Sequence, residues 1–487
     1  MMRLARLPSS SLLPTRQQQQ QQQLLSARRA PVHSMSTPLN PFQPRRAPTV
    51  MIVGGGLSGL MLGILLGRAN IPFHIFERAS QVRPLGSALG LNADILQVFE
   101  QLGLMDDIYK ITFPCRNMSF YDSKMSLTGQ IDMSHQKEVT GYDLRIFARP
   151  RLYELLRRQI PDDRVSCGKK VLRMEEKNNK VYIHCSDNST YEGDILVGAD
   201  GAYSGVRQSL YRQLDEKGVL PKDDLKTMSV GFTCMVGVAQ PKNPEKFPQL
   251  KEESNYAQVL GRDRLSWSLF SVPDNQICWG LGVQLSESEA KALQFRNSEW
   301  GPESNDAMIK EFENELCPWG GTMGDLIRDT PPELISKVFL EDKLFKTWFH
   351  GRTALIGDAA HKMLPGSGRG AAAALQDAVV LANCIYFMPD HSSKSVTEAF
   401  QEYHRQRYPQ IQEIYKESIS MSQFVFGQTW SNRLVRNMVL NMVPEQLQRR
   451  AFTKTYDYRP QIAWLPLAEN RGTAPVLPQE GKRLRFD

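Results

Sequence analysis

The stretch that decides the fold is Met51–Glu77, which reads MIVGGGLSGLMLGILLGRANIPFHIFE. A short apolar run leads into Gly54-x-Gly56-x-x-Gly59, an apolar stretch of helical length follows, and a second apolar run ends in Glu77. This order predicts a strand, a glycine turn, a helix and a second strand, the unit that holds the pyrophosphate of a dinucleotide.

Each residue of the motif has a physical task in such a unit. Gly54 permits the tight turn, Gly56 lets the backbone approach the pyrophosphate, and Gly59 lets the helix pack close to the strand. The N-terminus of the helix offers free N–H groups to the phosphates. Glu77 can accept hydrogen bonds from an adenosine ribose. The alternative is a glycine-rich turn that binds no ligand.

Length and composition indicate a globular protein of two or more domains. The chain has 487 residues, of which 41% are hydrophobic and 23% are charged. Residues 1–48 contain seven arginines, no lysine and no acidic residue, and so account for the whole net charge of +7. The remaining 52 basic residues balance 52 acidic ones. A neutral body does not favour a nucleic-acid partner.

The cysteines and histidines do not form a recognisable framework. The seven cysteines are scattered and odd in number, without a C-x-x-C pair, and the eight histidines have no metal-ligand spacing. We therefore expect no disulfide framework and no metal site, and a reducing compartment as the default.

The N-terminal residues 1–48 are of low complexity, with a glutamine run at Gln17–Gln23 and a proline-rich end. They predict a disordered segment. Two interpretations stay open: a mitochondrial transit peptide, or a tail upstream of a second start at Met35, with a cytoplasmic protein. The apolar run from Val50 to Gly67 is explained by the nucleotide-binding turn and not by a membrane span.

Several later segments have clear secondary-structure signals. The pattern predicts a helix from Ala93 to Leu102 closed by Gly103, and a hairpin turning at Asn178-Asn179. Short strands rich in aromatic residues recur over 229–283, and 304–330 is expected to be helical. Helices are also predicted from Ser395 to Phe426 and from Asn432 to Arg450, followed by an extended tail from Asp457.

Two further motifs accompany the glycine turn. They are Gly198-Ala-Asp-Gly201-x-x-Ser-x-Val-Arg207, and Gly357-Asp-Ala-Ala-His361 followed by Pro365 and Gly368-x-Gly370. In order and spacing the three motifs resemble the single-component FAD-dependent monooxygenases, the aromatic hydroxylase and fungal terpenoid epoxidase class. The resemblance covers roughly residues 49–420.

The resemblance implies an α/β fold. A Rossmann-like FAD-binding domain of the p-hydroxybenzoate hydroxylase type would carry an inserted, mostly antiparallel β-sheet substrate domain and C-terminal helices. The FAD-binding domain would comprise 49–116, 144–226 and 332–420. The substrate domain would comprise 117–143 and 227–331, and 421–487 would form C-terminal helices and a tail.

The resemblance also assigns roles to residues. Gly54, Gly56, Gly59 and Glu77 would hold the ADP half of FAD. The other cofactor-binding residues it implies are Gly90, Arg149, Asp200, Asp358, Gly370 and Ala371. Asp358 would contact the ribityl chain, and Pro365, Gly368 and Gly370 would surround the flavin ring. A helix N-terminus at Gly370 would stabilise the negative charge of reduced flavin.

Some of these residues have a structural alternative. Asp200 and Asp358 could be turn residues, Arg149 a surface residue, and Arg207 a helix salt-bridge residue. His361 is expected to be structural and not a catalytic base. The aromatic residues of 229–283 are expected to pack the sheet first and to line a pocket second.

The sequence departs from the family near the flavin ring. Arg369 replaces the usual glutamine, Ala372 the usual asparagine and Gln376 the usual acid. Arg369 could reinforce the binding of anionic flavin, or it could point to solvent.

The function implied is oxygen insertion into a lipophilic or aromatic small molecule, by hydroxylation or epoxidation through a flavin C4a-hydroperoxide. The co-substrates would be O2 and NAD(P)H, the latter binding transiently because no second G-x-G-x-x-G follows a strand. No residue stands out as a base, which favours epoxidation. A flavin dehydrogenase or reductase, or a flavin-binding protein without catalysis, stays possible.

The C-terminal part contains apolar residues at helical spacing, in Phe424-Val-Phe and in Leu434–Val443. The first interpretation is a helix that caps the substrate cavity. The second is a peripheral contact with a membrane.

Overall fold

The computed structural model describes residues 47–81, 85–261, 263–293, 303–427, 429–444, 447 and 456–479. The chain divides into units Met1–Pro41 and Phe42–Asp487, and every described residue lies in the second. Residues 1–46 of the predicted disordered segment or transit peptide thus lie outside the described residues. Among the helices of the described part, none is long and apolar enough to cross a membrane.

A mostly parallel sheet is built on strand β1 (Val50–Val53), which pairs in parallel with β2 (Phe73–Phe76) and β11 (Ile195–Gly198). All four residues of β1 are buried, because a parallel sheet covered on both faces selects continuous apolar runs. In the described residues the sheet has six strands, in the order β17-β18-β11-β1-β2-β7. The outer strands are β7 (Val165–Ser166), β17 (Phe349–His350) and β18 (Thr353–Leu355).

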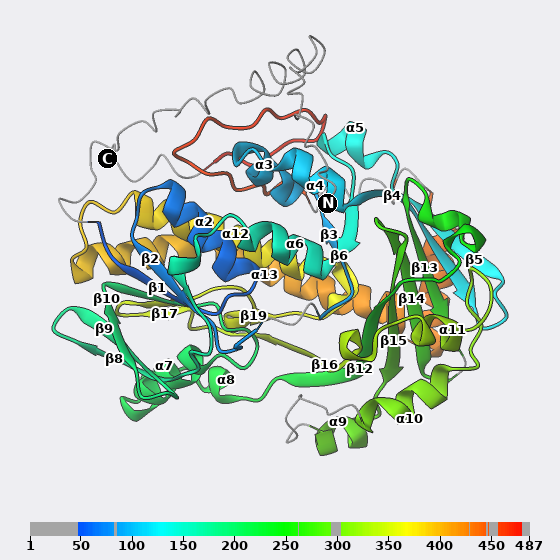
Figure 1. Cartoon of the computed structure of the whole chain (residues 1–487), viewed down its shortest axis with the longest axis horizontal. Helices are drawn as coiled ribbons and strands as arrows, with labels where there is room; N and C mark the ends of the chain where they lie inside the picture. The colour runs from blue at the N-terminus through cyan, green and yellow to red at the C-terminus, as the bar shows by residue number, and fades with distance from the viewer. Residues whose placement is uncertain are drawn as a thin grey trace, which may run out of the picture. The chain divides into compact units, whose positions relative to one another are not determined.

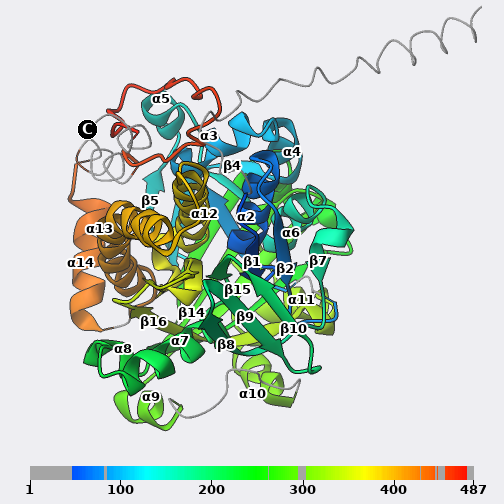
Figure 2. The same cartoon turned by 90° about the vertical axis from the view of Figure 1, so that its left-hand side faces the viewer.

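Helices α2 (Leu57–Arg68) and α12 (Gly370–Tyr386) lie side by side against this sheet, although they are 300 residues apart in the sequence (Figure 1). Both are apolar nearly all round and almost wholly buried. The long helix α13 (Ser393–Phe426) packs along α12 (Figure 2). Its bounds agree with the prediction of a helix from Ser395 to Phe426.

The second large sheet has the strand order β19-β16-β12-β15-β14-β13-β4-β6-β3, with β5 paired to β4, within the described residues. Its pairs are antiparallel except β4–β13, so the mostly antiparallel sheet is confirmed. Its strands are β3 (Ala88–Leu91), β4 (Phe113–Asp122), β5 (Leu127–Asp132), β6 (Arg145–Ala148), β12 (Ser229–Ala239), β13 (Ser254–Leu260), β14 (Leu265–Val272), β15 (Gln276–Gln284), β16 (Ser336–Leu344) and β19 (His361–Lys362).

The sequence predicts a sheet that is separate from the nucleotide-binding part. In the structure the two are continuous, so this prediction is wrong. Strands β3, β6, β16 and β19 come from segments predicted to be FAD-binding, and they extend the sheet at its two ends. The pairing of β3 with β6 joins residues more than fifty positions apart, for which the local pattern has no signal. The predicted domain boundaries remain a prediction.

One face of the second sheet is covered by two short helices, α10 (Glu303–Phe312) and α11 (Met323–Arg328). The prediction that 304–330 is helical is confirmed for these two helices but not for the segment between them. Pro318 lies in the interruption, and Gly320 and Gly321 there have positive φ angles, which end a helix.

The aromatic side chains under these helices serve packing, as predicted. The indole N–H of Trp267 donates to the carbonyl of Leu316, and that of Trp279 donates to Thr330 Oγ1, at 3.1 and 2.9 Å. Both indoles are buried, so these bonds satisfy donors that have no access to water.

Helix α14 covers Trp430–Asn441 and so overlaps the segment where a helix is predicted from Asn432 to Arg450. It lies beside α13 and against β5 (Figures 1 and 2). Pro444 follows shortly after its end, where it cannot continue a helix. Residues 448–450 lie outside the described part. The tail 456–479 has no helix or strand.

The remaining elements surround these layers. The predicted helix after Asn92 is confirmed as α3, and Gly103 beyond it has a φ of +72°. Asn178 and Asn179 both have positive φ and form the predicted hairpin turn. The other elements are α3 (Ala93–Gln101), α4 (Met105–Ile111), α5 (Gln136–Thr140), α6 (Arg149–Arg157), β8 (Val171–Lys177), β9 (Lys180–Cys185), β10 (Thr190–Gly193), α7 (Gly205–Glu216), α8 (Lys222–Leu225) and α9 (Glu287–Leu293).

Candidate active site

The glycine turn after β1 touches the second motif. Gly54 has a φ of +109°, and a Cβ at this position would lie 2.3 Å from the carbonyl oxygen of Ala199. A Cβ at Gly59 would lie 2.0 Å from the carbonyl oxygen of Gly54. Two backbone segments thus approach one another at distances that no side chain tolerates.

Two helix ends face open space. A Cβ built at Gly56, which precedes α2, at Gly368, two residues before α12, or at Gly370, which begins α12, would meet no neighbouring atom within 4 Å. Neither helix has a side-chain hydrogen bond to its N-terminal N–H groups in the described structure. N–H groups without a cap, next to open space, can donate hydrogen bonds to an anionic group or a carbonyl oxygen of a ligand.

The third motif brings these two helices together. Gly357 has a φ of +59°, and a Cβ there would lie 3.1 Å from both Ser58 Oγ on α2 and Ala374 Cβ on α12. The first turns of α2 and α12 and the strand-end turn therefore meet at one point. The three motifs, spread over 300 residues, form one site.

Glu77 lies beside the glycine turn, as its position after β2 predicts. Its carboxylate accepts hydrogen bonds from the N–H of Gly55 at 2.7 Å and of Ala79 at 2.8 Å. The two bonds fix the orientation of the carboxylate at the end of the sheet.

Asp358 lies among cations. Its carboxylate pairs with Lys362 Nζ at 2.6 Å, and the Asp358 side chain is 40% exposed. Burial works to raise the pKa of Asp358, but Lys362 and Arg149 outweigh it and the pKa is lowered. Desolvation lowers the pKa of the Arg149 guanidinium although this residue is exposed.

Asp200 and Arg207 have structural bonds. Asp200 accepts from Ser204 Oγ at 2.5 Å and from the N–H of Val206 at 3.2 Å, at the start of α7. Arg207 makes no salt bridge among the described residues. Its guanidinium donates to the carbonyl of Ala359 at 2.9 Å and lies over the ring of Phe345. It thus connects α7 to the third motif.

Gly90 and Pro365 lie on different elements of the site. Gly90 is in β3 opposite Ile146, where a Cβ would lie 3.1 Å from the Leu144 side chain. Pro365 opens the short turn before α12, and the N–H of Gly366 in that turn donates to Ser422 Oγ of α13 at 3.1 Å.

The sequence motifs did not point to the most buried charge of the site. Asp377 of α12 has no exposed surface and accepts three hydrogen bonds. The donors are the N–H of Gly357 at 2.9 Å, His361 Nε2 at 2.5 Å and Arg407 Nε at 2.8 Å. His361 is therefore placed as a structural residue, as expected. Arg407 lies on α13 with no local signal of its partner.

Arg369 is not directed to solvent, so that alternative is wrong. It is 6% exposed, and its guanidinium pairs with Glu417 of α13 at 2.9 Å and lies 3.7 Å from Asp94 of α3. Burial raises the pKa of Asp94 despite the adjacent cation. Ala372 beside it is buried, and Gln376 Nε2 donates to the carbonyl of Asp94 at 3.0 Å. The unusual arginine thus has carboxylate partners of its own.

Residues 47–418 match a family profile described as an FAD binding domain. The chain belongs to this FAD-binding family. The FAD-dependent monooxygenase ptmM of Penicillium ochrochloron is 28% identical over 393 residues, which cover 77% of this chain and 88% of that protein. The FAD-dependent monooxygenase atmM of Aspergillus flavus is 26% identical over 452 residues, covering 87% and 88%.

Solved structures show the same fold. Klebsiella pneumoniae HpxO complexed with FAD and uric acid has a TM-score of 0.69 at 21% identity, over 88% of this chain and 99% of HpxO. The 2,6-dihydroxypyridine-3-hydroxylase of Arthrobacter nicotinovorans has a TM-score of 0.62 at 18% identity, over 79% and 94%. The predicted family, the single-component FAD-dependent monooxygenases, is confirmed, as are the α/β fold class and the cofactor FAD.

The open helix ends fit this cofactor. The space in front of Gly56 would accommodate the pyrophosphate, and the space at Gly368 and Gly370 the ring. The partly exposed carboxylate of Asp358 is suited to bind hydroxyl groups. The individual residue roles remain predictions.

Two alanine substitutions within the glycine motif should have different effects, one on stability and the other on FAD binding. Gly59→Ala places a methyl group 2.0 Å from a backbone oxygen, so the free energy of unfolding of the apoprotein should fall by about 2–3 kcal/mol or more. Gly56→Ala enters open space, so the apoprotein should unfold as wild type does but bind FAD at least tenfold more weakly. Urea unfolding and FAD titration measure the two effects. Equal stability of the two variants would contradict the packing argument.

Asp377→Asn should destabilise the fold, because Arg407 would keep its buried charge without a carboxylate. We expect the free energy of unfolding of the apoprotein to fall by about 3–5 kcal/mol. Glu398→Gln is the control, because it removes only the exposed ion pair with Lys394 on α13. It should change the free energy of unfolding by less than about 0.5 kcal/mol.

The Asp377 effect should also depend on pH. His361 and Arg407 hold the pKa of Asp377 below its ordinary value against the effect of burial. A depressed folded pKa stabilises the protein fully above the unfolded pKa of about 3.9 and less as the pH falls through the folded value. The difference between wild type and Asp377→Asn should therefore narrow below about pH 4. A stability difference between wild type and Asp377→Asn that stays constant down to pH 3 would contradict the lowered pKa of Asp377.

Arg369→Gln restores the residue usual in the family but leaves Glu417 and Asp94 without their cation. We expect it to lower the free energy of unfolding by about 2–4 kcal/mol. The double variant Arg369→Gln, Glu417→Gln should lose less than the sum of the two single variants, because the two residues interact directly. Strict additivity in urea unfolding would show that the ion pair contributes nothing.

Proposed function

We propose that this enzyme uses NAD(P)H and O2 to insert one oxygen atom into a lipophilic or aromatic small molecule. The observation that carries the proposal is the convergence of two uncapped helix ends, those of α2 and α12, on open space at Gly56, Gly368 and Gly370. That arrangement suits a long cofactor with an anionic middle and an electron-accepting ring.

The residue roles belong to the same proposal. Gly54, Gly56 and Gly59 would hold the pyrophosphate against α2, and Glu77 would bind the adenosine ribose. The further contacts would come from Gly90, Arg149, Asp200 and Asp358, and from the N–H groups of Gly370 and Ala371. The hydrogen bonds of Glu77 and Asp200 within the protein support these roles by orienting both carboxylates.

FAD, when bound, supplies the electron transfer from NAD(P)H and the activation of O2. The protein has to orient the substrate and to exclude water from the ring. The turn Pro365–Ser367 is suited to both tasks, because it lies between the N-terminus of α12 and the last turns of α13. Arg369 would hold this turn to α13 through Glu417.

An aromatic cluster lies where the second sheet meets the end of α13. The rings of Phe120 and Phe424 meet edge to face at 5.8 Å, and those of Tyr256 and Phe270 stack at 4.5 Å. Phe424 lies two residues beyond Ser422, which contacts the turn. Aromatic side chains from the second sheet thus pack against the last turns of α13, the helix that also contacts the turn Pro365–Ser367.

Cys234 of β12 is partly exposed, and desolvation raises the pKa of its thiol to about 12. The thiol is therefore protonated at neutral pH and is a poor nucleophile. Oxygen transfer to an alkene requires neither a nucleophile nor a base in the protein.

The test is a substrate screen with the purified, FAD-loaded enzyme. A true substrate should accelerate the bleaching of the flavin absorbance by NADH or NADPH at least tenfold in stopped-flow measurements, and turnover under 18O2 should place one labelled atom in the product. Asp358→Ala serves as the matched variant and should lose FAD affinity.

Other outcomes would favour the rival functions. Turnover without label in the product would identify a dehydrogenase or reductase. A protein that is colourless, or yellow but never bleached by either nicotinamide cofactor, would identify a flavin-binding protein without catalysis.

A further inference from the structure

Helix α14 presents an apolar face outward. Trp430, Leu434, Met438 and Met442 are spaced four residues apart, at the helix and just beyond its end, and lie on one side of it. Trp430 is 79% exposed and Met442 is 70% exposed, and the two residues between them are about half exposed. Val435 adjoins them and is 54% exposed. We call these five residues the outer face of α14.

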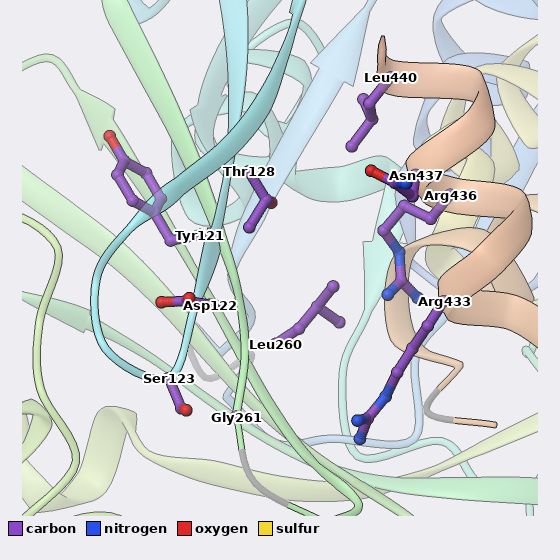
Figure 3. Close-up of a pocket in the computed structure, with 10 residues that line it drawn as sticks. All are labelled: Tyr121, Asp122, Ser123, Thr128, Leu260, Gly261, Arg433, Arg436, Asn437 and Leu440. Carbon is purple, nitrogen blue, oxygen red and sulfur yellow. The ribbon is translucent and has the colours of Figure 1, made fainter. Parts of the chain in front are cut away.

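The side of α14 that faces the protein carries Arg436 and Leu440, and Leu440 packs against β5 at Gly129. Arg436 is 5% exposed, and its guanidinium donates to the carbonyls of Phe424 and Gly427, each at 2.6 Å. Figure 3 shows Arg433, Arg436 and Asn437 extending from α14 toward a cavity of about 270 Å³, which the hairpin of β4 and β5 closes on its other side. Arg436 and Leu440 thus face the protein, Arg433 is exposed at the edge of the cavity, and the five residues of the outer face point away from it.

A surface helix in water usually turns its apolar stripe to the core, whereas α14 exposes most of its large apolar side chains. Large apolar patches on a protein surface mark contacts with a partner or a membrane. We propose that the outer face of α14 docks on the surface of a lipid bilayer, with the helix axis in the plane of the interface. The proposal concerns binding alone and does not rest on the proposed reaction.

The dimensions of the helix favour a bilayer over a second copy of the chain. A helix of 12 residues is about 18 Å long and 10 Å wide, so one face of it offers far less than the roughly 800 Å² that each partner of a stable dimer buries. A bilayer needs no matching surface, because its interior accepts each inserted side chain separately.

The composition of α14 also suits lipid. Tryptophan is enriched at the boundary between lipid and water, and Trp430 opens the helix. Trp430–Met442 contains two arginines and no acidic residue, so no carboxylate would be repelled by anionic headgroups. Because Arg436 is buried and only Arg433 is exposed, we expect the apolar face to dominate, with a modest gain from anionic lipid.

The docked helix would have two different surroundings. Its inner side borders the cavity between α14 and the second sheet, and its outer side would lie among acyl chains. An apolar compound that partitions into the bilayer would then meet the protein at this edge.

The experiment uses the full-length, FAD-loaded protein and vesicles of phosphatidylcholine with 30% phosphatidylserine. Wild type should sediment with the vesicles. The triple variant Trp430→Ser, Leu434→Ser, Met438→Ser should partition at least tenfold more weakly, with an unchanged melting temperature because these positions are exposed. The control triple variant Leu172→Ser, Val219→Ser, Leu225→Ser changes three equally exposed apolar residues elsewhere and should bind as wild type does.

Tryptophan fluorescence reports the site directly. Trp430 is the most exposed of the tryptophans in the described part of the chain. Brominated phosphatidylcholine should quench wild type, whereas Trp430→Phe should bind vesicles with the quenching largely lost.

Three results would overturn the proposal. Wild type could fail to bind vesicles, or the triple variant of α14 could bind as well as wild type. Alternatively, light scattering could show a dimer that only the α14 variant dissociates, which would make a second copy the partner.

Discussion

The structure depends on the carboxylate of Asp377. It is fully buried and accepts hydrogen bonds from Gly357, His361 and Arg407, which belong to the strand-end turn, the strand after it and helix α13. A buried carboxylate is tolerated only when donors and a cation surround it. The requirement holds the turn, α12 and α13 in one arrangement. That arrangement places the first turn of α12 beside α2, where the two open helix ends form the candidate FAD site.

The parts of this site that could be predicted from the sequence are those with a local physical signature. A glycine turn between an apolar strand and an apolar helix requires residues at fixed spacing, and Gly54, Gly56 and Gly59 satisfy it. The long helix α13 and the hairpin at Asn178-Asn179 were likewise found from spacing and turn chemistry. Where the signal is local, the sequence is sufficient.

What the sequence did not reveal depends on contacts between distant residues. Arg407 meets Asp377 across 30 positions, and Arg369 meets Glu417 across 48 and Asp94 across an even longer separation. The substitution of arginine for the usual glutamine therefore looked anomalous, although two carboxylates from other helices accommodate it. The two outer strand pairs of the second sheet were missed for the same reason, since β-pairing has no local signal.

The orientation of α14 follows from the end of α13. A helix leaves its last carbonyl groups without partners, and those near the end of α13 are met by the Arg436 guanidinium. Arg436 must therefore face inward, and this fixes the rotation of α14 about its axis. Residues at 430, 434, 438 and 442 lie on the side away from Arg436, so their apolar side chains face outward. A single capping requirement thus exposes the outer face of α14, and the same helix that secures Asp377 positions it.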